Sequence, residues 1–137
     1  MNSDQALLLV EDDDIDAMTV RRSLRELGSP NPLHRVTNGE EALAYLRDPA
    51  NPRPGLILLD INMPRMNGIE FLDHAKHDPA LCSIPVVVLT TSKEDTDRFN
   101  SFSKNVAGYM VKPVDYEQFV EVMRKIRDYW MLSESAH

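Results

Sequence analysis

The sequence predicts an α/β protein built on one doubly wound parallel sheet of five strands. Short apolar runs alternate along the chain with segments of helical spacing, and most of these runs lack the in-out alternation of a half-exposed strand. A five-fold repetition of strand and helix favours right-handed crossovers with helices on both faces of the sheet. The length of 137 residues suits one compact domain, so we expect a single domain over residues 1–137 with its core at about residues 6–130.

Five segments are the expected strands. Four of them are wholly apolar and should be buried on both faces of the sheet: Ala6–Val10, Leu56–Leu59, Val86–Leu89 and Tyr109–Val111. The fifth, Leu33–Thr37, is less apolar and lies between a proline-containing turn and Asn38-Gly39. We therefore place it nearer an edge of the sheet.

The segments between the strands show apolar residues three or four positions apart, as amphipathic helices do. The residues that carry this spacing are Ile15, Met18, Leu24 and Leu27 in the first segment, Ala42, Leu43 and Leu46 in the second, and Ile69, Leu72 and Ala75 in the third. The last helix has the clearest stripe, made of Phe119, Val122, Met123, Ile126, Tyr129 and Trp130. It should pack against the sheet. The polar segment Ser92–Asn105 is predicted as a further helix.

Composition excludes several classes of protein. Fifteen basic and twenty-two acidic residues give a net charge of −7, which opposes binding to the phosphates of nucleic acids. Cys82 is the only cysteine, so no internal disulfide can form. No apolar run approaches the roughly 20 residues that a membrane-spanning helix needs. We therefore expect a cytoplasmic protein that binds neither nucleic acid nor membrane.

Chemically reactive side chains follow four of the expected strands. Glu11 and Asp12 follow the first strand, Asp60 the third, Thr90 the fourth and Lys112 the fifth. In doubly wound sheets, ligands bind beyond the carboxyl ends of the strands. We therefore expect these side chains to converge on one site.

The residue types at this site point to phosphoryl transfer. Three crowded carboxylates repel one another, and a hard divalent cation such as Mg²⁺ relieves that repulsion. A carboxylate beside such a cation can attack phosphorus, which makes Asp60 the candidate nucleophile. Lys112 would supply a cation to one phosphoryl oxygen, and the Thr90 hydroxyl would donate a hydrogen bond to another.

With these residues the chain resembles the response-regulator receiver family, from Ala6 to about Trp130. Four segments in order carry the resemblance: Leu9–Asp13, Leu58–Gly68, Val88–Ser92 and Gly108–Pro113. The resemblance implies the flavodoxin-like (βα)5 receiver fold and a stand-alone receiver without an output domain. It also implies a phosphoacceptor signalling protein rather than an enzyme, one that assists its own phosphoryl transfer and dephosphorylation.

Individual roles follow from the resemblance, position by position. Asp60 corresponds to the phosphoacceptor, Glu11 and Asp12 to the acidic metal pair, and the Asn62 main-chain carbonyl to a further ligand of Mg²⁺, for which Mn²⁺ can substitute. Because Glu11 is longer than the aspartate that often stands there, it would reach the ion through water. Thr90 and Tyr109 match the family's switch pair. The bond between Lys112 and Pro113 is expected to be cis, since proline lowers the cost of that isomer.

The partner implied by the resemblance is a sensor histidine kinase. The segments around the site look most like those of stand-alone regulators that serve phytochrome-type kinases, although no downstream protein is indicated. Only seven residues follow Trp130, so we expect the output to occur through a changed contact surface. The expected surface for a partner or a homodimer comprises Ser92–Asn105, the last strand and the last helix.

The same residues allow other interpretations. Asp13 and Asp14 are expected only to cap a helix and to favour its dipole. A Mg²⁺-dependent phosphatase acting through an aspartyl phosphate would need an acid two positions after Asp60, where Asn62 stands. A degenerate receiver that binds partners constitutively would have lost residues of the phosphorylation site, and none of them is missing.

Overall fold

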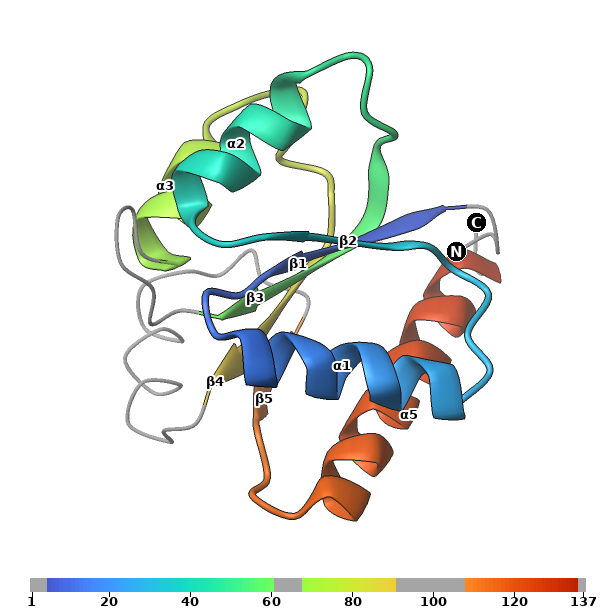
Figure 1. The fold of residues 1–137 in the computed structure, drawn as a ribbon. Helices are drawn as coiled ribbons and strands as arrows, with labels where there is room; N and C mark the ends of the chain where they lie inside the picture. The colour runs from blue at the N-terminus through green and yellow to red at the C-terminus, as the bar shows by residue number, and fades with distance from the viewer. Residues whose placement is uncertain (1–4, 61–67, 91–107, 136–137) are drawn as a thin grey trace.

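The computed structural model describes residues 5–60, 68–90 and 108–135. It shows a parallel sheet between two layers of helices (Figure 1). The five strands follow the order β2-β1-β3-β4-β5. The described elements are β1 (Ala6–Val10), α1 (Asp14–Glu26), β2 (Leu33–Val36), α2 (Gly39–Arg47), β3 (Pro54–Asp60), α3 (Gly68–Lys76), β4 (Val86–Thr90), β5 (Gly108–Val111) and α5 (Tyr116–Ser135). The predicted doubly wound sheet is confirmed. The helix predicted over Ser92–Asn105 lies outside the described residues.

The apolar strands are buried on both faces because each face carries its own core. Along β1, Leu8 and Val10 pack with residues of α2 and α3, whereas Leu7 and Leu9 pack with residues of α1 and α5. Figure 1 shows the same division, with α2 and α3 on one side of the sheet and α1 and α5 on the other. Successive side chains of a strand point to opposite faces, so a strand covered on both faces needs an uninterrupted apolar run.

The strand boundaries differ little from those predicted. β2 stands at the edge of the sheet, as expected, and all four of its residues are only half-buried. β3 begins at Pro54, two residues before the predicted Leu56, and its first residue can be proline because the first position need not donate to the ladder. β3 also includes Asp60, so the candidate nucleophile is fixed by the strand itself.

The predicted apolar stripe of α1 was wrong at two positions. Ile15 and Met18 are 74% and 68% exposed, and the helix buries Ala17, Val20 and Leu24 instead. The spacing of these three residues also fits one face of a helix, but the small Ala17 gives little signal in the sequence. The interpretation of Asp13 as a cap is confirmed, because its side chain accepts hydrogen bonds from the amides of Ile15 and Asp16.

The prediction that α5 packs against the sheet is confirmed for its described side chains. Phe119, Met123 and Ile126 are buried in the core that also contains Leu7 and Leu9. Arg127 ties the helix to the end of α1, since its Nη1 donates to the Leu27 carbonyl at 2.8 Å. Within the described ranges, no helix combines the length and the apolar composition that crossing a membrane requires.

Candidate functional site

The strand register brings the candidate residues to one edge of the sheet. Val10 is paired with Leu59, so Glu11 follows β1 at the level of Asp60. Thr90 is paired with Val111, so Lys112 lies one position beyond that pair. The expected convergence at the carboxyl ends of the strands follows directly from this register.

Three carboxylates meet at this edge. Glu11, Asp12 and Asp60 each offer one oxygen, and these oxygens all lie within 4.8 Å of one another. Their surroundings differ, because Glu11 is buried, Asp60 is half-buried and Asp12 is exposed. The cluster therefore extends from the protein interior to the solvent, and an ion or a phosphoryl group could approach it from the side of Asp12.

Lys112 contributes the positive charge of the site. Its Nζ donates to Glu11 Oε1 at 2.8 Å and lies 3.5 Å from Asp16 Oδ2. The side chains of Lys112 and Glu11 are only 9% and 2% exposed, so solvent screens this ion pair little. The other carboxylate oxygen of Glu11 accepts from the Asp13 amide at 3.3 Å, which fixes the orientation of the carboxylate.

Burial and close contacts change the pKa values of Glu11 and Lys112. Burial, followed by the hydrogen bond to Asp60, raises the pKa of Glu11 to about 8, although Lys112 acts in the opposite direction. Burial alone would lower the pKa of Lys112, but its hydrogen bond to Glu11 and the nearby acids raise that pKa above its ordinary value. Lys112 therefore stays charged, and a second negative charge beside Asp60 is unfavourable.

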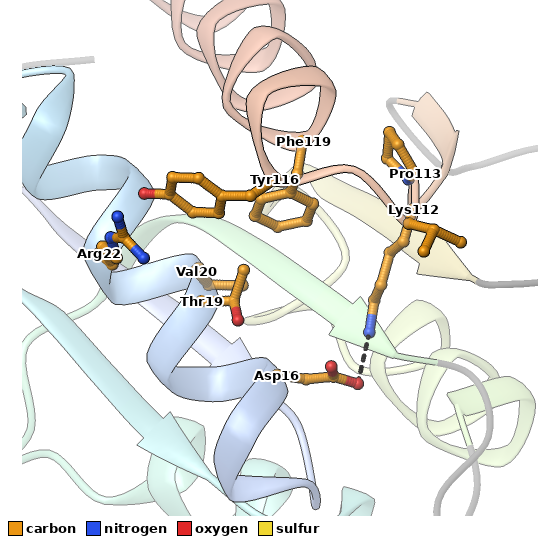
Figure 2. Close-up of a pocket in the computed structure, with 9 residues that line it drawn as sticks. Asp16, Thr19, Val20, Arg22, Lys112, Pro113, Tyr116 and Phe119 are labelled. Atoms are coloured by element: carbon orange, nitrogen blue, oxygen red, sulfur yellow. Dashed lines mark ion pairs between the residues drawn. The ribbon is translucent and has the colours of Figure 1, made fainter.

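A cleft opens beside the ion pair, between α1 and the start of α5. Figure 2 shows Lys112 reaching from the end of β5 toward Asp16 on α1, with Tyr116 lying toward Arg22. The cleft has a volume of about 450 Å³. The Arg22 guanidinium carbon lies 4.3 Å from the centre of the Tyr116 ring, a cation–π contact that joins the two helices.

The family follows from a comparison of the whole sequence. The family model described as the response regulator receiver domain matches residues 7–124, which include every described residue of the carboxylate cluster and Lys112. This chain belongs to the response regulator receiver family.

Several relatives match the receiver along most of their length. The probable methanogenesis regulatory protein FilR2 of Methanothrix harundinacea is 36% identical over 128 residues, which cover 91% of this chain and 83% of FilR2. The response regulator Rcp1 of Synechocystis sp. is 34% identical over 134 residues, covering 95% of this chain and 91% of Rcp1.

Two solved structures resemble the receiver in both fold and sequence. The phosphorylated cyanobacterial phytochrome response regulator RcpA superimposes with a TM-score of 0.84 at 36% identity, covering 93% of this chain and 94% of RcpA. The Mn²⁺-bound form of Rcp1 gives a TM-score of 0.81 at 35% identity, covering 92% and 94% of the two chains. The resemblance to regulators of the phytochrome type thus holds in sequence and in structure.

The receiver brings together four of the residues singled out in the sequence, namely Glu11, Asp12, Asp60 and Lys112. Asn62 lies outside the described residues. Thr90 ends β4 and Tyr109 lies in β5, as predicted, but their side chains are not among those described. The roles assigned to these three residues stay predictions.

The expected cis bond before Pro113 was wrong. No cis peptide bond occurs in the described residues, so Lys112 and Pro113 are joined by a trans bond. From this trans backbone, Lys112 Nζ reaches Glu11 Oε1 at 2.8 Å. For most peptide bonds that precede proline, the trans isomer also has a lower free energy than the cis isomer.

Two further residues at the site were not found by sequence reasoning. Asp16 shares Lys112 with Glu11, and Arg35 donates from Nε to the Glu11 carbonyl at 3.0 Å. Asp16 lies four positions after Asp12, in the first turn of α1, which could have drawn attention to it. Arg35 lies on a neighbouring strand at a distance of 24 positions from Glu11, and only the pairing of β1 with β2 places the two together.

Proposed function

We propose that this receiver accepts a phosphoryl group on Asp60 in a Mg²⁺-dependent reaction, with a sensor histidine kinase as the donor. The main support is the convergence of three carboxylates within 4.8 Å of one another beside the buried cation of Lys112. An acidic cluster alone would be weak support, because exposed acids are common on proteins. The pairing of this cluster with Lys112 supplies both the nucleophile and a positive charge for the transferred group.

The described residues fit a hard divalent cation. All three acids offer oxygen ligands, which Mg²⁺ and Mn²⁺ prefer. Burial, followed by the contact with Asp60, raises the pKa of Glu11, and a bound cation would favour the charged form of these carboxylates. Asp12 and Asp60 would ligate the ion directly, with Glu11 reaching it through water and the Asn62 carbonyl completing the set. The Mn²⁺-bound form of Rcp1 supports a divalent cation as the ligand of this receiver.

In the proposed reaction, a carboxylate oxygen of Asp60 attacks the phosphorus of a phosphohistidine. A new P–O bond forms as the P–N bond breaks, and the electron pair of that bond returns to the imidazole nitrogen of the kinase. Bound Mg²⁺ would neutralise negative charge on the transferring oxygens. Lys112 Nζ would stabilise one phosphoryl oxygen and the Thr90 hydroxyl another. Attack by water on the acyl phosphate reverses the modification.

The proposed output is a change of contact surface. Phosphate on Asp60 would draw Thr90 inward, and the ring of Tyr109 would fill the space that Thr90 leaves. A partner or a second copy would then bind through Ser92–Asn105, β5 and α5. RcpA is named as a phytochrome response regulator, which supports a phytochrome-type kinase as the partner of this chain. A cytoplasmic location stays a prediction.

The proposal is tested with acetyl phosphate as a small donor. The wild-type receiver should gain the mass of one phosphoryl group with Mg²⁺ and none with a chelator. Asp60→Ala should not gain it. The matched control is Asp73→Asn, which changes an exposed acid on α3 and should behave as the wild type.

Each other function predicts a different result. Undiminished labelling of Asp60→Ala would contradict the proposal. Steady hydrolysis of generic phosphate esters would indicate the phosphatase, and metal-independent partner binding without labelling would indicate the degenerate receiver.

A further inference from the structure

The four consecutive acids from Glu11 to Asp14 have different roles in the structure. Glu11 and Asp12 belong to the carboxylate cluster, and Asp13 caps α1. Asp14 lies outside both roles and is 86% exposed at its side chain, yet its Oδ1 accepts a hydrogen bond from Arg35 Nη1 at 2.7 Å. Arg35 is therefore bound to the loop that carries the proposed metal ligands.

Arg35 holds this loop at two points. Its Nε donates to the Glu11 main-chain carbonyl at 3.0 Å, and its Nη1 donates to Asp14. These two anchors lie on either side of Asp12 in the sequence. The Glu11 amide also donates to the Val36 carbonyl at 3.0 Å, so β2 fixes Glu11 through both of its main-chain groups.

The two contacts use Nε and Nη1 of the guanidinium. Its remaining group, Nη2, is buried and has no hydrogen-bond partner among the described residues. A buried donor without a partner costs free energy. The position of Arg35 therefore leaves one of its own donors unsatisfied within the described part of the chain while the other two bind the loop. The rigid geometry of the guanidinium allows the Glu11 carbonyl and the Asp14 carboxylate to be bound at the same time.

We propose that Arg35 is a positioning residue that fixes the Asp12 carboxylate, relative to Glu11 and Asp60, for a divalent cation. This inference rests on the proposed function, because it assigns the cation to the cluster. Groups that orient metal ligands commonly change metal affinity by 10- to 100-fold when they are removed, roughly the size of effect expected here.

The charge of Arg35 and its positioning contacts should have opposite effects on Mg²⁺ affinity, so the two can be distinguished by experiment. A nearby positive charge repels a divalent cation, so the loss of that charge alone would strengthen Mg²⁺ binding. The loss of a positioning contact would weaken it. Arg35→Lys separates the two effects, because a lysine keeps the charge but cannot donate in two fixed directions.

The first measurement is Mg²⁺ affinity by calorimetry, using Mg²⁺ alone as the probe. Arg35→Ala and Arg35→Lys should each weaken binding by about 10-fold or more. The matched control is Arg53→Ala, since Arg53 also ties a loop by donating to the Ala80 carbonyl and to Ser83, but before the start of β3. That variant should bind Mg²⁺ as the wild type does. Unchanged or tighter binding in Arg35→Ala would overturn the proposal.

The second measurement needs no metal. Hydrogen exchange at the Glu11 and Asp13 amides, followed by NMR in the presence of a chelator, should speed up in Arg35→Ala and stay unchanged in Arg53→Ala. Unchanged exchange in Arg35→Ala would overturn the positioning role. If the wild type bound no Mg²⁺, the proposed function would fail, whereas this exchange measurement would still decide whether Arg35 holds the loop. At saturating Mg²⁺, phosphorylation of Arg35→Ala should return to near the wild-type rate.

Discussion

The buried ion pair between Lys112 and Glu11 allows a quantitative prediction. Lys112→Met keeps an apolar stem of similar length but removes the ammonium group, which lies 2.8 Å from Glu11 Oε1. Removing one partner of a buried pair costs about 3–5 kcal/mol when the other partner stays charged. Because the pKa of Glu11 is about 8, its carboxyl already holds a proton for much of the time at neutral pH, so the substitution mainly removes the hydrogen bond that Lys112 Nζ donates. We therefore expect a loss of about 2 kcal/mol in the free energy of unfolding at neutral pH without metal.

Mg²⁺ should reverse most of this loss. A divalent cation at the cluster neutralises Glu11 in place of the lysine, and removal of the competing ammonium group strengthens cation binding. In saturating Mg²⁺ the loss should therefore fall below about 1 kcal/mol. The assay is urea unfolding of both proteins with chelator and with Mg²⁺. The matched control is Lys125→Met on the exposed face of α5, which should change stability little in either buffer.

Two results would refute this reasoning about Lys112. An equal loss of stability with chelator and with Mg²⁺ would show that the lysine does not share Glu11 with a metal site. No loss with chelator would show that the pair contributes nothing to the fold.

Two further predictions concern the metal and the switch. Asp12→Ala should weaken Mg²⁺ binding by at least about tenfold in a calorimetric titration. In chelator it should raise stability by up to ~1 kcal/mol, because one repelling carboxylate is lost but solvent screens this exposed residue; unchanged affinity would remove Asp12 from the site. Thr90→Ala should still be phosphorylated but should respond weakly to beryllium fluoride in backbone NMR, and a full response across β5 would contradict the proposed switch.

Burial on both faces made the strands predictable from the sequence. An uninterrupted apolar run such as Ala6–Val10 is needed only where helices cover both sides of a sheet, and each of its residues is buried. Which face of α1 is buried was not predictable in the same way. Ile15 and Met18 are spaced as a buried pair would be, but tertiary packing selects the adjacent face, whose small Ala17 has little weight in the pattern.

Some residues of the candidate site were predictable from the sequence and others were not. Glu11, Asp12, Asp60 and Lys112 were predictable because each follows a strand, and the carboxyl ends of parallel strands meet at one edge. Arg35 was not predictable, since its contacts depend on strand pairing and on side-chain geometry. The trans bond before Pro113 could not be foreseen either, because both isomers are accessible before proline.

The most direct test of the central claim is chemical trapping of the phosphorylated residue. After incubation with acetyl phosphate and Mg²⁺, borohydride reduces an acyl phosphate on an aspartate to homoserine, which peptide mass spectrometry can locate. The proposed function predicts homoserine at position 60 and nowhere else, with none formed when Mg²⁺ is withheld. Homoserine at position 12, or a phosphoryl group that survives reduction on Ser, Thr or His, would contradict the account.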